Sequence, residues 1–422
     1  MTIRRQFPAT FLPVVNQLLT MQALASLDTS ASQNGGTTMR RTGSSKLLVA
    51  VAALAASVQI AFAFDVGEIG SFHIGGHPIT VSGLPQQEIQ MPGGAPITVD
   101  PNGDYHTGQM YVQFVKLANP TAKYPLLMWH TGGITGASWE SKPDGNPGWM
   151  QFFLRQGHSV YVSDAVERGR ATFSRPEIYM SNPIFRDKRD SWEIFRIGPP
   201  GSYRTNPSER KANPDVRFPL SAFDTFQMQM APRWAVTGDA TQAAYGDLVQ
   251  RVCPCVIIAH GQAGLFALRA ALTQPDKVKA LIAIEPAFAP TPDHPEMSRL
   301  KNTPHLWVWG DFLDTNPVWV DHVKGVKPYH EALGAKGVPS TWMDLPAEGI
   351  KGNTHVPMMD LNSDIVAARI QAWMTKHGLT KADAVAAAPK AQRQPARSAS
   401  ARSTAPAKAP QSRAVGTPQS GN

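Results

Sequence analysis

Five short stretches of this chain are almost entirely hydrophobic, and the segments between them carry hydrophobic residues at helical spacing. Short apolar strands separated by helices are typical of a parallel β-sheet that is covered by helices on both faces. The pattern therefore predicts an α/β fold. Its predicted strands occupy residues 126–129, 159–162, 256–259, 280–284 and 305–309, with 341–345 as a last strand.

Two regions flank or interrupt this alternation within a predicted domain over residues 64–380. Residues 66–117 indicate antiparallel strands with turns, because polar and apolar residues alternate from Tyr111 to Leu117. The run from Phe72 to Val81 is broken by Gly75-Gly76, and the domain ends with an amphipathic helix over 365–377.

The alternation lapses between residues 170 and 240, where aromatic residues are scattered among polar ones. By our count this insertion follows the fourth parallel strand, so it lies over the carboxyl ends of the strands, where open α/β sheets bind ligands. We interpret it as a cap. The alternative is a long surface segment that packs its own aromatic residues.

The net charge of +8 is carried by the two ends of the chain. Residues 1–63 carry +4 and residues 381–422 carry +6, which leaves −2 for residues 64–380. A basic surface for nucleic acid belongs on the folded part, so we expect no nucleic-acid partner. Residues 381–422 are rich in Ala, Pro, Ser and basic residues and predict a disordered tail.

Residues 1–63 have the features of a leader followed by a secretion signal, with Met39 as the expected start. Arg40, Arg41 and Lys46 precede an apolar run, and Ala61-Phe62-Ala63 is typical of a cleavage site. We expect a periplasmic or secreted protein with no stable membrane span after cleavage. The alternative is a single membrane anchor.

The two cysteines, Cys253 and Cys255, have one residue between them. A disulfide across that spacing closes a strained ring, so we expect two buried thiols at the start of a strand, with pairing in an oxidising compartment as the alternative. Two cysteines do not make a metal site, and no other motif indicates a metal or a cofactor.

The strongest motif is a strand over 256–259, a tight turn and a helix over 265–272. It is typical of the nucleophile elbow, in which small residues let the strand and the helix approach closely. Ala259 and Gly264 are such residues. In this frame the nucleophile position, where serine is expected, holds Gly261, which suits the strained backbone but has no reactive side chain.

Other residues predict the rest of a hydrolytic site at the same edge of the sheet. His355 follows the last strand and is placed to act as a general base. Glu285 and Asp311 each follow a strand, and both remain candidates for the acid that orients the imidazole. The amides of Gly132, Gly133 and Gln262 are expected to form an oxyanion hole.

Together these segments resemble a small group of secreted bacterial α/β-hydrolase esterases, known for a disulfide between adjacent cysteines beside the oxyanion hole. The likeness extends over residues 66–377 and is carried by His130–Glu140, Pro143-Asp144-Gly145, Gly148-Trp149 and Arg168-Gly169-Arg170. It implies an α/β-hydrolase fold and a Ser-Glu-His triad, in which Glu285 and His355 match the acid and the base. The adjacent cysteines fall on Gly132-Gly133 and the serine on Gly261, so this chain lacks both.

Three interpretations follow. In the first, His355 held by Glu285 activates water against a carboxylic ester or a related acyl bond, without the serine. In the second, the chain is a pseudoenzyme that binds a small apolar ligand. In the third, Gly261 is a substitution in an ordinary serine esterase. Aromatic residues of the predicted cap favour an apolar or aromatic ester as the small-molecule substrate.

Overall fold

Residues 64–381 are the part of the chain that the computed structural model describes. The predicted leader and signal peptide over 1–63 lie outside the described residues, as does the predicted tail after Lys381. Between residues 64 and 381, no helix has the length and hydrophobicity that crossing a membrane requires.

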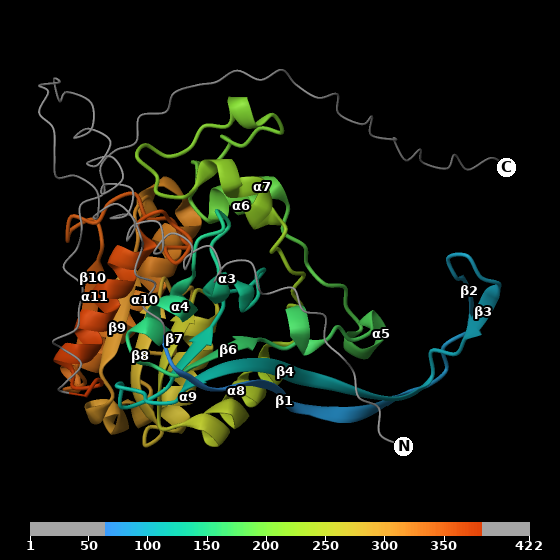
Figure 1. Cartoon of the computed structure of the whole chain (residues 1–422), viewed down its shortest axis with the longest axis horizontal. Helices are drawn as coiled ribbons and strands as arrows, with labels where there is room; N and C mark the ends of the chain where they lie inside the picture. Colours follow the sequence, from blue (N-terminus) through green and yellow to red (C-terminus); the bar gives the residue numbers. More distant parts are fainter. Residues whose placement is uncertain (1–63, 382–422) are drawn as a thin grey trace, which may run out of the picture. The chain divides into compact units, whose positions relative to one another are not determined.

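An eight-stranded sheet in the order β1-β4-β6-β5-β7-β8-β9-β10 forms the framework (Figure 1). Strands β5 to β10 run parallel to one another, and β4 runs antiparallel to its neighbours β1 and β6. This confirms the predicted, mostly parallel sheet. The strands are β1 Val66–Val81, β4 Gly103–Leu117, β5 Leu126–Trp129, β6 Val160–Asp164, β7 Cys255–His260, β8 Val278–Ile284, β9 His305–Trp309 and β10 Ser340–Asp344.

Helices cover both faces of this sheet, as predicted. Helices α4 and α11 pack on one face together with α3, and α8, α9 and α10 pack on the other. Their bounds are α3 Ala137–Glu140, α4 Trp149–Arg155, α8 Gly238–Val252, α9 Ala263–Thr273, α10 Pro317–Ala335 and α11 Ser363–Lys376. The 3₁₀ helices η4 Pro295–Asn302 and η5 Leu313–Thr315 lie in connections.

The two hydrophobic cores follow from the two-residue period of the strands. In β7, Val256 and Ile258 face the core beside α4 and α11, whereas Ile257 and Ala259 face the core beside α8 and α9. All four side chains are buried. A strand that is buried on both faces must be apolar at successive positions, which is the pattern that predicted the sheet.

Strand β1 is longer than the sequence predicted, because the two glycines do not end it. Gly75 and Gly76 have φ of +73° and +80°, and pairing with β4 continues on both sides of them. Glycine adopts positive φ at little cost, so the strand bends locally and goes on. Beyond it, β2 Gln87–Gln90 and β3 Pro96–Val99 form a separate hairpin at the tip of the β1–β4 arm (Figure 1).

The expectation of two free thiols was wrong, because Cys253 and Cys255 form a disulfide. Helix α8 ends just before Cys253, and β7 begins at Cys255. The chain reverses at Pro254 between them and brings the two Cα atoms to 4.4 Å, within the range that a disulfide spans.

The insertion follows β6, which is the second of the parallel strands along the chain and not the fourth, and it folds into short helices and irregular chain. Its helices are η1 Gly169–Ala171, α5 Pro176–Tyr179, α6 Lys188–Ile194, η2 Pro207–Glu209, η3 Leu220–Ala222 and α7 Phe223–Gln227. The amide of Ala231 donates to the carbonyl of Gly133 at 2.9 Å, and that of Arg217 donates to the carbonyl of Gly352 at 2.7 Å. The insertion therefore touches the loops that follow β5 and β10, and Figure 1 shows α6 and α7 beyond that end of the sheet.

Candidate active site

The turn between β7 and α9 has the geometry of a nucleophile elbow. Strand β7 ends at His260, Gly261 has φ of +54°, and α9 begins at Ala263. Only glycine adopts this left-handed conformation without strain. A Cβ at Gly264 would lie 2.6 Å from Cβ of Pro286, so the close approach of helix and strand requires glycine there too.

His355 lies opposite this turn, in the loop between β10 and α11. Its Nδ1 donates to Oε2 of Glu285 at 2.7 Å. Its Nε2 makes no hydrogen bond within residues 64–381 and lies 3.2 Å from the point that a Cβ of residue 261 would occupy. The structure therefore brings Gly261, His355 and Glu285 together in the order that a triad requires, with the imidazole nitrogen facing the position of the missing side chain.

The imidazole is held on several sides and is only 3% exposed. The ring of Phe195 stacks on it with centroids 5.6 Å apart, and the ring of Trp319 lies at 4.2 Å. Its own backbone carbonyl accepts a 2.7 Å hydrogen bond from Nε2 of His260, and its amide donates to the carbonyl of Phe195 at 3.0 Å. These contacts fix the ring plane.

Burial lowers the pKa of His355 well below 6.5, and the positive charges of Arg196 and Arg186, with His322, lower it further. The imidazole is therefore neutral at pH 7. Because Nδ1 carries the proton given to Glu285, Nε2 holds a free lone pair. This is the form that a general base needs.

Glu285 is fully buried and uses both carboxylate oxygens. One accepts from His355, and the other accepts from Nη2 of Arg196 and, at 2.7 Å, from the amide of Gly310. Its φ is +43°, an uncommon conformation for a residue with a side chain. The ion pair with Arg196 offsets the burial of this carboxylate and holds it aimed at the imidazole.

Asp311, the other candidate acid, does not reach the imidazole. Its carboxylate accepts from the amides of Phe312 and Gly352, both at 2.9 Å, and its own amide donates to the carbonyl of Asn353. It therefore fixes the loop that carries His355 and makes no hydrogen bond to the ring.

Thr131 is a site residue that the sequence did not indicate. A Cβ at position 261 would overlap its hydroxyl oxygen and would lie 2.7 Å from its Cβ. The hydroxyl thus stands where the side chain of residue 261 would be. His130 holds the backbone there: Nδ1 donates to the carbonyl of Thr131 at 2.7 Å, and Nε2 accepts from the amide of Ala165 at 3.0 Å. A threonine in a glycine-rich loop matches no catalytic motif.

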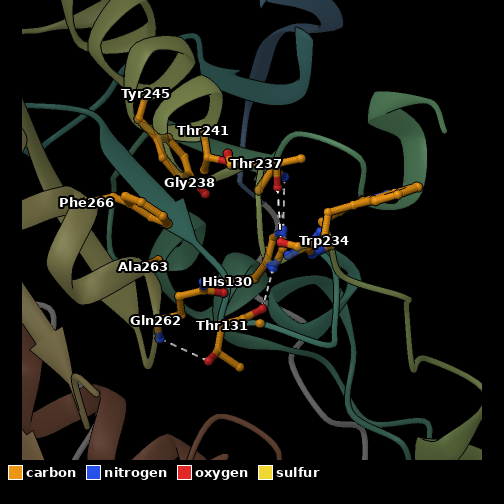
Figure 2. A pocket seen from close by; sticks show the side chains of 13 residues that line it. His130, Thr131, Trp234, Thr237, Gly238, Thr241, Tyr245, Gln262, Ala263 and Phe266 are labelled. Atoms are coloured by element: carbon orange, nitrogen blue, oxygen red, sulfur yellow. Dashed lines mark hydrogen bonds between the residues drawn. The ribbon is translucent and has the colours of Figure 1, made fainter. Parts of the chain in front are cut away.

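The three amides predicted for the oxyanion hole differ in whether they already donate a hydrogen bond. Those of Gly132 and Gly133 donate no hydrogen bond within the described part of the chain. That of Gln262 donates to the hydroxyl oxygen of Thr131 at 3.1 Å, as Figure 2 shows. Gly133 has φ of +86°, which favours glycine, whereas a Cβ at Gly132 would lie 2.6 Å from Oε1 of Gln262, the movable end of a side chain.

Comparison with known proteins agrees with this geometry, although no family model matches the chain. A protein described as the probable secreted lipase phiG of Fungal sp. (strain ATCC 74256) is 27% identical over 325 residues, which are 65% of this chain and 88% of that protein. A solved structure described as a novel bacterial esterase is 29% identical, with a TM-score of 0.65, and the match covers 75% of this chain and 98% of that one. The chain has an α/β-hydrolase fold and is similar to a lipase and an esterase.

A buried carboxylate orders the histidine loop of this α/β hydrolase. Asp360 accepts from the amide and the hydroxyl of Thr354 at 2.8 and 2.9 Å, and from Nδ2 of Asn353 at 3.0 Å. Burial raises its pKa to about 7. Asp360 thus positions the residues next to His355, a role that the sequence gave no signal for.

Two hollows adjoin the candidate site. A cavity of about 20 Å³, whose lining includes Gly132, has room for about one water molecule. Figure 2 shows Thr131 and Gln262 on one side of it and Tyr245 and Trp234 on the other. A cleft of about 450 Å³ opens beside the turn that follows β5. Its lining includes Thr135, Ala137, Phe173, Met228, Met230 and Pro232.

Across residues 64–381, no group of three acidic, His or Cys side chains is arranged to hold a metal ion.

Proposed function

We propose that this protein hydrolyses carboxylic esters or related acyl bonds with His355 as general base and Glu285 as the acid that orients it. The observation that carries the proposal is the lone pair of His355 Nε2, which faces the elbow beside amides able to stabilise an oxyanion. His355 removes a proton from water, the water oxygen attacks the acyl carbon, and the proton passes to the leaving alcohol.

The charge that develops on the carbonyl oxygen is held by backbone donors. The amides of Gly132 and Gly133 have no competing acceptor within residues 64–381. One such donor is typically worth about 10²–10³ in kcat. The two relatives, described as a lipase and an esterase, support the same class of reaction.

The substrate that we propose is a small, apolar or aromatic ester. Aromatic rings of Phe195 and Trp319 border the imidazole, and the 450 Å³ cleft is lined by Phe173 and by Met228 and Met230 of the proposed cap. Such a volume falls within the usual range for small-molecule sites. The proposed cap, residues 170–240, supplies most of this apolar lining.

We also propose that the protein is exported to the periplasm or secreted, with a signal peptide before residue 64. The description of the fungal relative as secreted supports this, and so does the Cys253–Cys255 disulfide, because disulfides persist in oxidising compartments.

One observation favours a second function, a pseudoenzyme that binds its ligand without turnover. The nucleophile position has no side chain, and Gln262, whose amide would serve the oxyanion, already donates to Thr131. In that case the same aromatic surroundings bind an apolar ligand and release it unchanged.

The test is hydrolysis of p-nitrophenyl acetate and butyrate by the full chain. We expect turnover that His355→Ala lowers by at least about 100-fold, because a general base contributes about 10²–10⁴. The control is His106→Ala, since His106 is exposed on β4. Turnover that does not depend on His355 contradicts the assignment, and saturable binding without turnover supports the pseudoenzyme.

A further inference from the structure

We propose that the hydroxyl of Thr131 is the nucleophile of this site, supplied by the loop after β5 in place of the serine that the elbow lacks. This inference rests on the proposed ester hydrolysis and deepens it, because it replaces direct attack by water with a covalent acyl intermediate. It concerns one atom, Oγ1 of Thr131.

The first argument is position. A Cβ built on Gly261 overlaps Thr131 Oγ1, and the same point lies 3.2 Å from Nε2 of His355. The hydroxyl therefore occupies the space of the absent serine side chain, which His355 Nε2 faces, although no hydrogen bond joins Oγ1 and Nε2. Apo hydrolase sites commonly have loose base–nucleophile contacts that tighten when the substrate binds.

The second argument is hydrogen bonding. Thr131 Oγ1 accepts from the amide of Gln262 at 3.1 Å, and its own proton has no acceptor among residues 64–381. His355 Nε2, in turn, has no donor in the same part of the chain. Thr131 is only 5% exposed and His355 only 3%, so both groups lie in a largely buried site. An N–H directed at the oxygen also favours the alkoxide that forms during attack.

The third argument is rigidity. The bonds of His130 to the Thr131 carbonyl and to the amide of Ala165 fix the backbone on which the hydroxyl stands. Threonine is also stiff at χ1 because it is β-branched. A nucleophile must be held within a fraction of an ångström of its working position, and both features serve that need.

The chemistry balances in two steps. Thr131 Oγ1 bonds to the acyl carbon and gives its proton to Nε2 of His355, the ester C–O bond breaks, and the alcohol leaves with that proton. Water then gives a proton to His355, its oxygen bonds to the acyl carbon, and the bond to Oγ1 breaks. Oγ1 regains the proton, and the carboxylic acid leaves.

Trapping tests this directly. The full chain is treated with an alkyl fluorophosphonate, and the modified peptide is identified by mass spectrometry. We expect one adduct, on Thr131, which is absent from Thr131→Val. With p-nitrophenyl butyrate, Thr131→Val should lower kcat by at least about 100-fold, whereas Thr131→Ser keeps the hydroxyl and should stay within about 10-fold. Thr273→Val, at an exposed threonine of α9, is the matched control and should react as the native chain does.

The outcomes separate this inference from the proposed function. Hydrolysis that depends on His355 but is unchanged in Thr131→Val, with no adduct on Thr131, overturns the inference and leaves direct attack by water. An adduct on Thr131 without measurable turnover supports the nucleophile and removes the proposed function. Because trapping uses the native chain, the result stands even if Thr131→Val does not fold.

Discussion

Restoring a serine at the elbow requires two substitutions, because positions 131 and 261 compete for one space. Gly261→Ser alone places a Cβ 2.7 Å from Cβ of Thr131 and onto its hydroxyl. Overpacking of this kind costs about 1–3 kcal/mol. The left-handed backbone, with φ of +54°, adds about 1–2 kcal/mol for a residue with a side chain. We expect the single variant to lose about 2–5 kcal/mol of unfolding free energy and to gain no activity.

Adding Thr131→Gly removes both clashing atoms and turns the loop into the His-Gly-Gly-Gly type of many esterases. The backbone strain at position 261 and the 3.2 Å contact of its Cβ with Nε2 of His355 then remain. The two substitutions should therefore couple favourably by about 1–3 kcal/mol in a double-mutant cycle. A triad nucleophile is worth up to about 10⁶ in kcat, so the double variant should exceed Gly261→Ser by at least about 100-fold.

Urea unfolding of the native chain, both single variants and the double variant measures the coupling. Hydrolysis of p-nitrophenyl butyrate, with fluorophosphonate labelling at position 261, measures the activity. Thr131→Gly alone lacks both hydroxyls and is the inactive control. If Gly261→Ser alone is as stable as the native chain and fully active, the steric reasoning is refuted.

Three further predictions concern the charges around the imidazole. A general base must be neutral, and burial lowers the pKa of His355, so the acid limb of kcat/KM should lie below pH 6.5. Arg186→Gln removes a positive charge that lowers this pKa and should therefore move the limb to higher pH. Coinciding pH–rate profiles of the native chain and the variant would contradict this. Arg196→Met leaves Glu285 buried without its cation and should cost about 3–5 kcal/mol in urea unfolding, and an unchanged midpoint would show that the pair is not needed. Glu285→Gln should lower kcat by about 10³–10⁴, whereas Asp311→Asn should lower it by less than about 10-fold; equal losses would mean that both carboxylates serve the imidazole.

The sequence predicted the fold well because the sheet is buried on both faces. Residues 256–259 and 280–284 are all apolar, so the sequence pattern predicts strands there, and the structure places both in strands β7 and β8 of the sheet. Local conformation was harder to predict. Gly75-Gly76 was expected to interrupt a strand that bends and continues, and the spacing of Cys253 and Cys255 did not indicate the reversal at Pro254 that lets them pair.

The sequence predicted those site residues that directly follow a strand and match the triad pattern of the esterases that it resembles. Glu285 and His355 are hydrogen-bonded to each other, as that pattern implies. Position alone could not distinguish Glu285 from Asp311, because each of them follows a strand; the resemblance favoured Glu285. Thr131 could not be predicted, because its importance depends on the empty space at Gly261. Asp360 acts only through buried hydrogen bonds that the fold creates.

The shared space between residues 131 and 261 also means that neither position can be exchanged independently of the other. Serine at the elbow meets the hydroxyl and the Cβ of threonine in the neighbouring loop, so it enters at a cost in stability. Glycine at both positions removes that clash but leaves neither oxygen. A single exchange is therefore unfavourable in either order, through lost stability in one and through the lost hydroxyl in the other.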